Sequence, residues 1–235
     1  MAIHKKQYHG VFAEHYGHTE TWDTRVIPGM LRSLPAISGN SALLDLGCGA
    51  GHFLPYARQK GYQHYVGIDL SSDMVKRASQ CHPTGEFLVA SAAQFSHLLS
   101  DQQMRFDAVV SIMMLSTIPS KHDVLSVFKQ SYAVLKHGGV LVLCTPHPAF
   151  NSYMQHNNDT QVNTEFEGYY AQGRRYDVTR TIGDTKLTFT DYHWPLTTLI
   201  DCIVTAGFKL TGIDECQSTN DKQANPSHII FIATK

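Results

Sequence analysis

The chain has 235 residues, 43% of them hydrophobic and 17% charged, which suits one substantial hydrophobic core and leaves little room for two. Its 19 Lys and Arg residues nearly balance 20 Asp and Glu residues, so the basic surface of a nucleic-acid-binding protein is not expected. No apolar stretch has the length of a membrane-spanning helix, and the N-terminus lacks the apolar part of a secretion signal. These features predict a cytoplasmic protein that binds neither membranes nor nucleic acids.

Cysteine and histidine patterns indicate neither disulfides nor a metal site. The five cysteines are scattered and contain no CxxC pair, which is typical of reduced thiols. Among the 14 histidines there is no HExxH motif and no pair beside a carboxylate at a familiar ligand spacing. We therefore expect no bound metal.

Short apolar runs alternate with segments of helical periodicity along the first two thirds of the chain. Residues 1–34 precede the first run, and we expect them to fold as a lid over its carboxyl end. Alternation of this kind is typical of parallel strands joined by crossover helices. The predicted strands are 42–46, 64–69, 86–89, 106–112 and 139–145.

The clearest helix lies between the fourth and fifth predicted strands. Its apolar residues recur at three- and four-residue steps, and Gly138-Gly139 is predicted to end it as a left-handed cap. These apolar residues are Val124, Leu125, Phe128, Tyr132 and Leu135.

After Thr145 the alternation stops, and residues 146–194 are predicted to form an inserted cap. Two strand-like segments, YDVTRTI and KLTFTDY, flank Gly183-Asp184 and predict a hairpin. A helix is expected over 195–206, followed by strands at 208–214 and 228–234 that are close enough to pair antiparallel. The whole chain, 1–235, is thus predicted to be one α/β domain with a doubly wound seven-stranded sheet.

A glycine-rich turn, Asp45-Leu46-Gly47-Cys48-Gly49-Ala50-Gly51, follows the first strand. In open parallel sheets, ligands bind outside the carboxyl ends of the strands, where glycines let a ligand approach the backbone. A dinucleotide fingerprint needs G-x-G-x-x-G, but His52 stands at its third glycine, and Asp45 would face a pyrophosphate. NAD is therefore disfavoured, whereas the cationic sulfonium and ammonium groups of S-adenosylmethionine (SAM) suit Asp45.

The second strand ends in Gly67-Ile68-Asp69. A carboxylate at this place can accept hydrogen bonds from both hydroxyls of a ribose. Leu70 follows directly and is expected to pack on the adenine. The glycine turn and the acid together predict an adenosine-containing ligand.

Four segments, LLDLGCGAG, VGIDLS, FDAVVSIMMLSTIP and LKHGGVLVLCTP, resemble the successive motifs of class I SAM-dependent methyltransferases of the methyltransferase-type-11 group. The resemblance covers roughly residues 22–145 and continues to 235 in strand order. It implies a Rossmann-like methyltransferase fold whose last strand is antiparallel, with SAM as cofactor.

Carried over residue by residue, the resemblance implies a set of SAM contacts. The three glycines line the methionine part, Asp69 holds the ribose, and the Ser111 backbone contacts the amino group. Arg25, before Pro28-Gly29, is placed to clamp the methionine carboxylate, since a guanidinium binds bidentately. Many relatives have an acid near the adenine where this chain reads Val89–Ala93, so the Ser91 hydroxyl or the Ala92 amide is expected to substitute. The glycines are Gly47, Gly49 and Gly51.

The acceptor side is less determined, because methyl transfer is an in-line displacement that needs positioning more than a nucleophilic residue. His147 and His193 are the candidate general bases if the acceptor arrives protonated. Tyrosines gather in the predicted cap, where rings such as that of Tyr176 would attract a sulfonium or simply pack.

The sequence therefore predicts a SAM-dependent methyltransferase with a small-molecule acceptor. Two alternatives stay open. The amino group of SAM could attack its own γ-carbon and release methylthioadenosine, or the chain could bind SAM without turnover. The acceptor, the alkylated atom and the oligomeric state are not encoded in any motif that we find.

Overall fold

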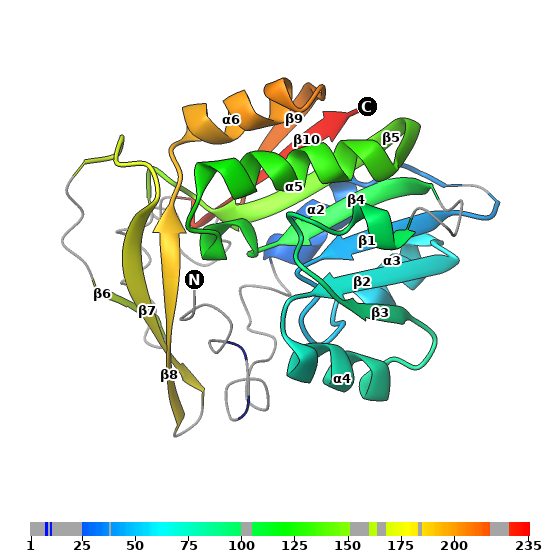
Figure 1. The fold of residues 1–235 in the computed structure, drawn as a ribbon, viewed down its shortest axis with the longest axis horizontal. Coiled ribbons are helices and arrows are strands. Elements are labelled where there is room, and N and C mark those ends of the chain that lie inside the picture. The colour runs from blue at the N-terminus through cyan, green and yellow to red at the C-terminus, as the bar shows by residue number, and fades with distance from the viewer. Residues whose placement is uncertain are drawn as a thin grey trace.

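The computed structural model describes residues 8, 10, 25–37, 39–99, 105–150, 160–163, 168–182, 185–216 and 226–235. Its centre is a seven-stranded sheet (Figure 1). The strands are β1 (Ala42–Leu46), β2 (His64–Asp69), β3 (Glu86–Val89), β4 (Phe106–Ile112), β5 (Leu135–Pro146), β9 (Lys209–Cys216) and β10 (His228–Thr234).

The strand order is β3-β2-β1-β4-β5-β10-β9. β1 pairs in parallel with both β2 and β4, so the chain leaves β1 first to one side and then to the other. β10 is antiparallel to both of its neighbours, β5 and β9. The doubly wound sheet with an antiparallel last strand is confirmed, and its switch point lies between β1 and β4, where such sheets bind ligands.

Helices cover both faces of the sheet, α5 and α6 in front and α2 and α3 behind in the view of Figure 1. Successive residues of β1 alternate between the two sides: Leu44 packs with the α5 and α6 side chains, and Leu43 with those of α2 and α3. Two apolar layers therefore enclose the sheet. The helices are α2 (Ile27–Ser33), α3 (Leu54–Lys60), α4 (Ser72–Cys81), α5 (Lys121–Val134) and α6 (Leu196–Thr205), with short 3₁₀ turns η3 (Ser96–Leu99) and η4 (Leu115–Thr117).

The predicted end of the long helix is wrong. α5 ends at Val134, Leu135 is already extended, and Gly138 takes its positive φ of 78° inside β5, not at a helix cap. The Gly138 N–H donates to the carbonyl of Lys235 at 3.1 Å, and the register with β4 shifts nearby. Pairing with β4 and the C-terminus outweighs the local tendency of two glycines to end a helix.

The predicted cap contains a second sheet of three antiparallel strands, with order β6-β7-β8. The strands are β6 (Thr160–Asn163), β7 (Arg174–Ile182) and β8 (Thr185–His193). β7 and β8 form the predicted hairpin, in which Arg174 pairs with His193 at one end and Ile182 with Thr185 at the other. Its Gly183-Asp184 turn lies outside the described residues. β6 was not predicted.

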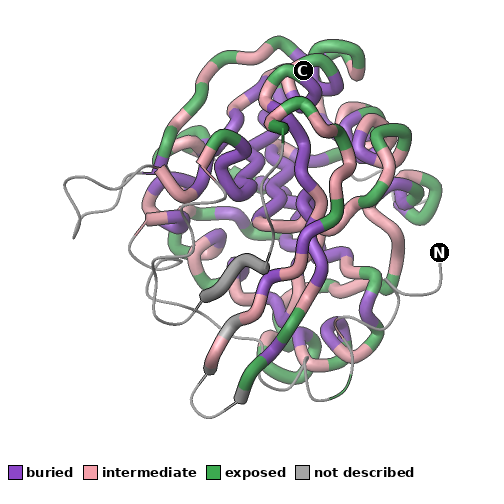
Figure 2. The backbone as a smooth tube through the Cα atoms, turned by 90° about the vertical axis from the view of Figure 1, so that its left-hand side faces the viewer, coloured by how far each residue is buried: buried purple, intermediate pink, exposed green. Residues whose placement is uncertain are grey.

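The cap hairpin stands beside the main sheet, and β8 runs into α6 (Figure 1). In β8, positions near α6 are mostly buried, whereas exposed positions occur toward the tip of the hairpin (Figure 2). The helices of the described segments are all too short or too polar to cross a membrane.

Candidate cofactor and acceptor site

The glycine turn after β1 is held against the end of β2. The N–H groups of Gly47 and Cys48 both donate to the Ile68 carbonyl, at 2.7 and 3.0 Å. Gly47, Gly49 and Gly51 have φ of 74°, 53° and 79°, in the left-handed region that favours glycine. A Cβ at Gly47 would lie 2.5 Å from Cβ of Met114, whereas one at Gly49 would meet no atom within 4 Å. The turn is thus closed against the protein at Gly47 and open at Gly49.

Asp69 lies at the carboxyl end of β2 and organises this turn. Its Oδ2 accepts the Gly49 N–H at 2.9 Å, and its Oδ1 accepts the Ser71 N–H at 2.8 Å. A carboxylate oxygen can accept more than one hydrogen bond. Next to Asp69, Leu70 is 47% exposed. Asp69, predicted to bind the ribose, and Leu70, predicted to contact the adenine, are therefore adjacent to each other, and Asp69 is hydrogen-bonded to the turn at Gly49.

Asp45 is buried at the end of β1 and accepts a hydrogen bond from the Tyr65 hydroxyl. Burial raises its pKa to about 7, the hydrogen bond from Tyr65 opposes this, and the charge of Asp69 adds to it. A cationic ligand beside Asp45 would favour the ionised carboxylate. Tyr65 is a site residue that the motifs did not reveal, because its position in β2 reads only as one more apolar strand residue.

The end of β4 completes the donor side. Ser111 is buried and its hydroxyl donates to the Leu46 carbonyl at 3.0 Å, which ties β4 to the start of the glycine turn. Met113, two residues further, has a φ of 62°, the one positive value outside glycine among the described residues. Its N–H donates to the Cys144 carbonyl at 2.9 Å. Strained backbone is found most often at binding sites, and no sequence signal announced it here.

Ser91 and Ala92 follow β3, where an adenine contact was expected. The Ser91 hydroxyl accepts the Ala93 N–H at 3.3 Å, so it shapes the loop. Ala92 is half-buried in the same loop. β3 pairs with β2, and Val89 at the end of β3 is the partner of Asp69. Ser91 and Ala92 therefore follow the strand that lies beside Asp69.

The predicted lid is described only at residues 8, 10 and 25–34. The carbonyl of Tyr8 accepts the Ser71 hydroxyl at 2.6 Å, and the Gly10 N–H donates to Asp73 Oδ2 at 2.9 Å. Tyr8 also packs against a small cluster that joins Ala50 of the glycine turn to Leu187 of the cap. This part of the N-terminal segment therefore lies between the cofactor side and the cap.

Arg25 stands two residues before α2, a helix that packs on β5 and β10. A hydrogen bond with the Cys144 thiol is the main reason that the pKa of Cys216 is lowered, and the charges of Arg32 and Arg25 contribute. Arg25 thus lies near Cys216 at the end of β9, whose thiol meets that of Cys144 in β5.

A small pocket lies between the carboxyl ends of the strands and the cap. Its walls come from η4, the end of β5, the cap hairpin and α6, which are far apart in the sequence. Tyr176 is the predicted catalytic residue that lines it. The lining residues are Ser116, Thr145, Pro146, Pro148, Tyr176, Tyr192, Trp194 and Leu199.

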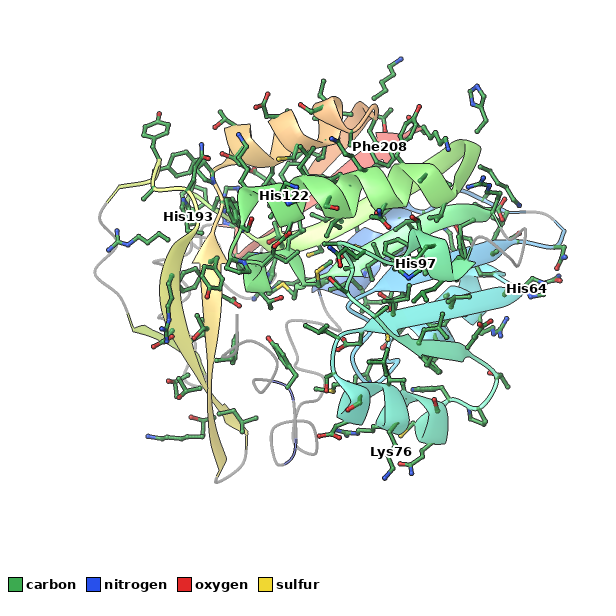
Figure 3. All side chains as sticks on the ribbon, in the orientation of Figure 1. His64, Lys76, His97, His122, His193 and Phe208 are labelled. Carbon is green, nitrogen blue, oxygen red and sulfur yellow. The ribbon has the colours of Figure 1, made fainter. Side chains whose placement is uncertain are left out.

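The two candidate bases are buried outside this lining. His147 Nδ1 accepts the Ala149 N–H at 3.2 Å, and its Nε2 lies 3.0 Å from Glu215 Oε1. His193, labelled in Figure 3, donates from its Nε2 to the Tyr169 carbonyl at 2.6 Å, and burial lowers its pKa. The structure brings Tyr176 to the pocket and gives both histidines hydrogen bonds that hold the surrounding loops.

The donor side fits SAM. Around one turn the structure has open space at Gly49, a carboxylate at the end of β2 and the exposed Leu70, which is the kind of surroundings expected for SAM. No cluster of three or more His, Cys, Asp or Glu placed to hold a metal occurs in the described segments.

Comparison with known proteins agrees with this geometry. A family model described as a methyltransferase domain matches residues 18–213. A protein of Haemophilus influenzae described as uncharacterized is 27% identical over 202 residues, covering 80% of this chain and 74% of its own length. A malonyl-[acyl-carrier protein] O-methyltransferase of Hamiltonella defensa is 33% identical over 106 residues, covering 45% of this chain and 38% of its own.

A solved structure with the same fold is the S-adenosylmethionine-dependent methyltransferase of Mesorhizobium loti. It superposes with a TM-score of 0.66 at 20% identity, over 88% of this chain and 96% of that one. The family match spans most of the chain and includes the glycine turn, Asp69 and the end of β4. The chain therefore belongs to the methyltransferase-domain family and is a SAM-dependent methyltransferase.

Proposed function

We propose that this enzyme methylates a small-molecule acceptor held in the pocket between the strand ends and the cap. The observation that carries the proposal is the pocket lining: Ser116 and Thr145 come from the sheet side, and Tyr176 comes from the cap. SAM supplies the methyl group, and the chain supplies the positions of donor and acceptor. A pocket closed by cap residues suits a small acceptor better than an extended polymer.

On the donor side, the proposal keeps the roles that the resemblance implies. Gly47, Gly49 and Gly51 lie along the methionine part, and Asp69 accepts the ribose hydroxyls. Leu70 and the loop of Ser91 and Ala92 border the adenine, while Arg25 holds the carboxylate. Support comes from the open turn at Gly49 and from the neighbouring positions of Asp69 and Leu70. Ser111 and Asp45 are proposed to face the amino group of SAM. A cation at this position would stabilise the ionised form of the buried Asp45 carboxylate.

Tyr176 is proposed to face the sulfonium. It is 5% exposed and lines the pocket, so its ring is screened from water. A cation–π contact in such a place contributes about 2 kcal/mol. We expect Tyr176→Phe, which keeps the ring, to retain most of kcat, and Tyr176→Leu to lose roughly tenfold or more. Equal losses in both variants would contradict a role of the ring.

The cap and the N-terminal segment are proposed to act as covers of one SAM-binding domain. Tyr8 and Leu187 meet in one cluster with Ala50, which supports a continuous cover over the donor side. The reduced state of all five cysteines is consistent with a cytoplasmic enzyme, which we also propose. Fractionation of cells that express a tagged chain tests the cytoplasmic location.

The acceptor class is tested by incubating the purified enzyme with methyl-labelled SAM in three mixtures. These are a small-metabolite extract, nucleic acid, and malonyl-acyl carrier protein, the last because of the relative from Hamiltonella defensa. We expect label in a metabolite, with S-adenosylhomocysteine as coproduct. Label in the carrier protein or nucleic acid alone would overturn the small-molecule proposal. Methylthioadenosine formed without acceptor would instead support attack on the γ-carbon, and SAM binding without any product would support a non-catalytic role.

A further inference from the structure

Asp191 is a buried acid of the cap that none of the roles above uses. It lies in β8, its residue is 4% exposed, and its Oδ1 is fully buried without a hydrogen-bond partner. Burial raises the pKa of this carboxyl to about 7, and an interaction with the Ser116 hydroxyl partly offsets that effect. Burying a carboxyl oxygen without a hydrogen bond destabilises the fold, and a bound ligand that donates a hydrogen bond to Oδ1 would remove this destabilisation.

The strand register places Asp191 at the acceptor pocket. Asp191 pairs with Tyr176 across the hairpin, and paired residues of antiparallel strands have their side chains on the same face. Tyr176 and Ser116 both line the pocket, and Ser116 belongs to η4, on which β8 packs. The Asp191 carboxyl, which interacts with Ser116 and whose strand partner is Tyr176, therefore lies directly behind two lining residues of the pocket. His193, labelled in Figure 3, follows on the same face of β8 and marks this end of the hairpin.

We propose that Asp191 binds the amino group of the acceptor and takes up its proton, so that the enzyme is an N-methyltransferase of a small amine. This inference rests on the proposed function, because it identifies the acceptor class for the same pocket. A carboxylate attracts an ammonium group, and it would repel an acceptor that is itself a carboxylate or a phenolate. The pocket thus selects by charge.

The chemistry balances without any further reactant. Asp191 takes one proton from the ammonium form of the acceptor and frees the nitrogen lone pair. That lone pair forms the bond to the methyl carbon of SAM while the carbon–sulfur bond breaks, and the sulfur keeps the bonding electron pair. The products are a methylated ammonium, S-adenosylhomocysteine and a protonated Asp191, which returns its proton to solvent after product release.

Asp191 is the acidic side chain on this side of the pocket, and the titratable groups around it can be named. Among the side chains that the structure describes, the titratable neighbours on the inner face of the hairpin are His193 on its own strand, and Tyr176 and Arg174 on β7. Tyr192, the next residue of β8, also lines the pocket. The pKa of His193 is lowered, chiefly by burial, so this ring is neutral near pH 7. η4 contributes Ser116 and no titratable group. Asp177, by contrast, pairs with Arg175 and Thr190 on the outer face of the hairpin.

Asp177 supplies a matched control, since it is a carboxylate of the same hairpin on the opposite face. The experiment uses the full-length enzyme and begins with SAM affinity by calorimetry. A metabolite extract is then separated by ion exchange into cationic, anionic and neutral fractions, and each is incubated with methyl-labelled SAM. Wild type, Asp191→Asn and Asp177→Asn are compared, with pH profiles of the initial rate from pH 5.5 to 9.

We expect label in the cationic fraction alone. Asp191→Asn should bind SAM as wild type does and lose about 100-fold or more in rate. The wild-type rate should fall below about pH 7 as Asp191 is protonated, whereas the rate of the variant, which has no base for the ammonium proton, should keep rising up to about pH 9 as more of the acceptor becomes free amine. Asp177→Asn should stay within about twofold of wild type, because its carboxylate lies outside the pocket.

The failures are distinguishable. Absence of SAM binding in wild type would overturn the proposed function and this inference with it. SAM binding with label in the anionic or neutral fraction, or in none, would overturn the amine acceptor alone. Methylthioadenosine formed without any fraction would also overturn it, since the reacting amine would then belong to SAM. An Asp191→Asn variant with the wild-type rate and pH profile would remove the proton-accepting role.

Discussion

The donor side and the cap side of this enzyme are built by different means. On the donor side, binding geometry comes from backbone: three glycines in the left-handed region, and the Gly49 N–H held by Asp69. On the cap side, the pocket is made by side chains from η4, β5, the hairpin and α6. Backbone sites tolerate few residue types, whereas side-chain pockets can change their lining without changing the fold. One donor is therefore compatible with many acceptors.

The largest expected effect breaks the donor side alone. Gly49→Val should weaken SAM binding by about 100-fold or more, because a branched side chain is strained at φ 53° and would occupy the open space at the turn. Calorimetry measures the affinity and circular dichroism the fold. Gly39→Val is the matched control: Gly39 has a φ of 76° and likewise meets no atom within 4 Å, but it precedes β1. If both variants bound SAM equally well, the turn would not be the site.

A second test concerns the carboxylate that holds the turn. Asp69→Ala should cost about 1–3 kcal/mol of SAM binding, since it removes charge-assisted hydrogen bonds. Asp107→Ala serves as control, because Asp107 also accepts a backbone N–H, that of Ala42 at 2.8 Å, but at the opposite end of the sheet. It should lower the unfolding free energy and leave SAM affinity unchanged. Unaltered affinity in Asp69→Ala would remove the ribose assignment.

Arg25→Ala tests the reach of the N-terminal segment into the donor side. We expect a loss of about 1.5–3 kcal/mol for SAM, the range for hydrogen bonds to charged groups. A decarboxylated SAM analogue should lose much less, because it lacks the group that Arg25 holds. Equal losses for the two ligands would separate Arg25 from the carboxylate.

The pKa of Asp45 makes the ligand-free donor side sensitive to pH. Its folded pKa of about 7 lies above the unfolded 3.8, so the fold disfavours the ionised form, and stability from this group is lost as pH rises from about 4 through 7. The Tm of Asp45→Asn should equal that of wild type near pH 4 and lie roughly 2–8 °C above it at pH 8. Thermal unfolding without ligand at both pH values measures this. A constant difference would show that Asp45 does not titrate in this range.

The smallest effect belongs to the cap side. The Trp194 indole N–H donates to the Ile118 carbonyl at 3.1 Å and joins the end of the hairpin to the loop after η4. Trp194→Phe should lower the unfolding free energy by about 0.5–1.5 kcal/mol, and SAM affinity should stay within about twofold. Denaturant unfolding and calorimetry report the two quantities. A large loss of SAM affinity would mean that the two sides are coupled.

Much of the donor side could be read from local sequence. The glycine spacing after β1 and the acid after β2 each sit at the end of a recognisable strand, and parallel strands bring their carboxyl ends together by topology. The hairpin around residues 183–184 was also readable, because two alternating strands flanked one turn. The end of α5 was not, since Gly138 responds to pairing with the C-terminus and β4 and not to its neighbours in the chain.

The sequence by itself determined the sheet and the cofactor class and predicted the main cofactor residues, because these depend on periodicity and on glycine and acid positions within a few residues of one another. Tertiary structure alone decided which cap residues reach the pocket. It put Tyr176 at the wall and gave both candidate histidines hydrogen bonds elsewhere. It also showed the buried Asp191 and the strained Met113. Burial and contact between distant segments follow from packing, which no local pattern records.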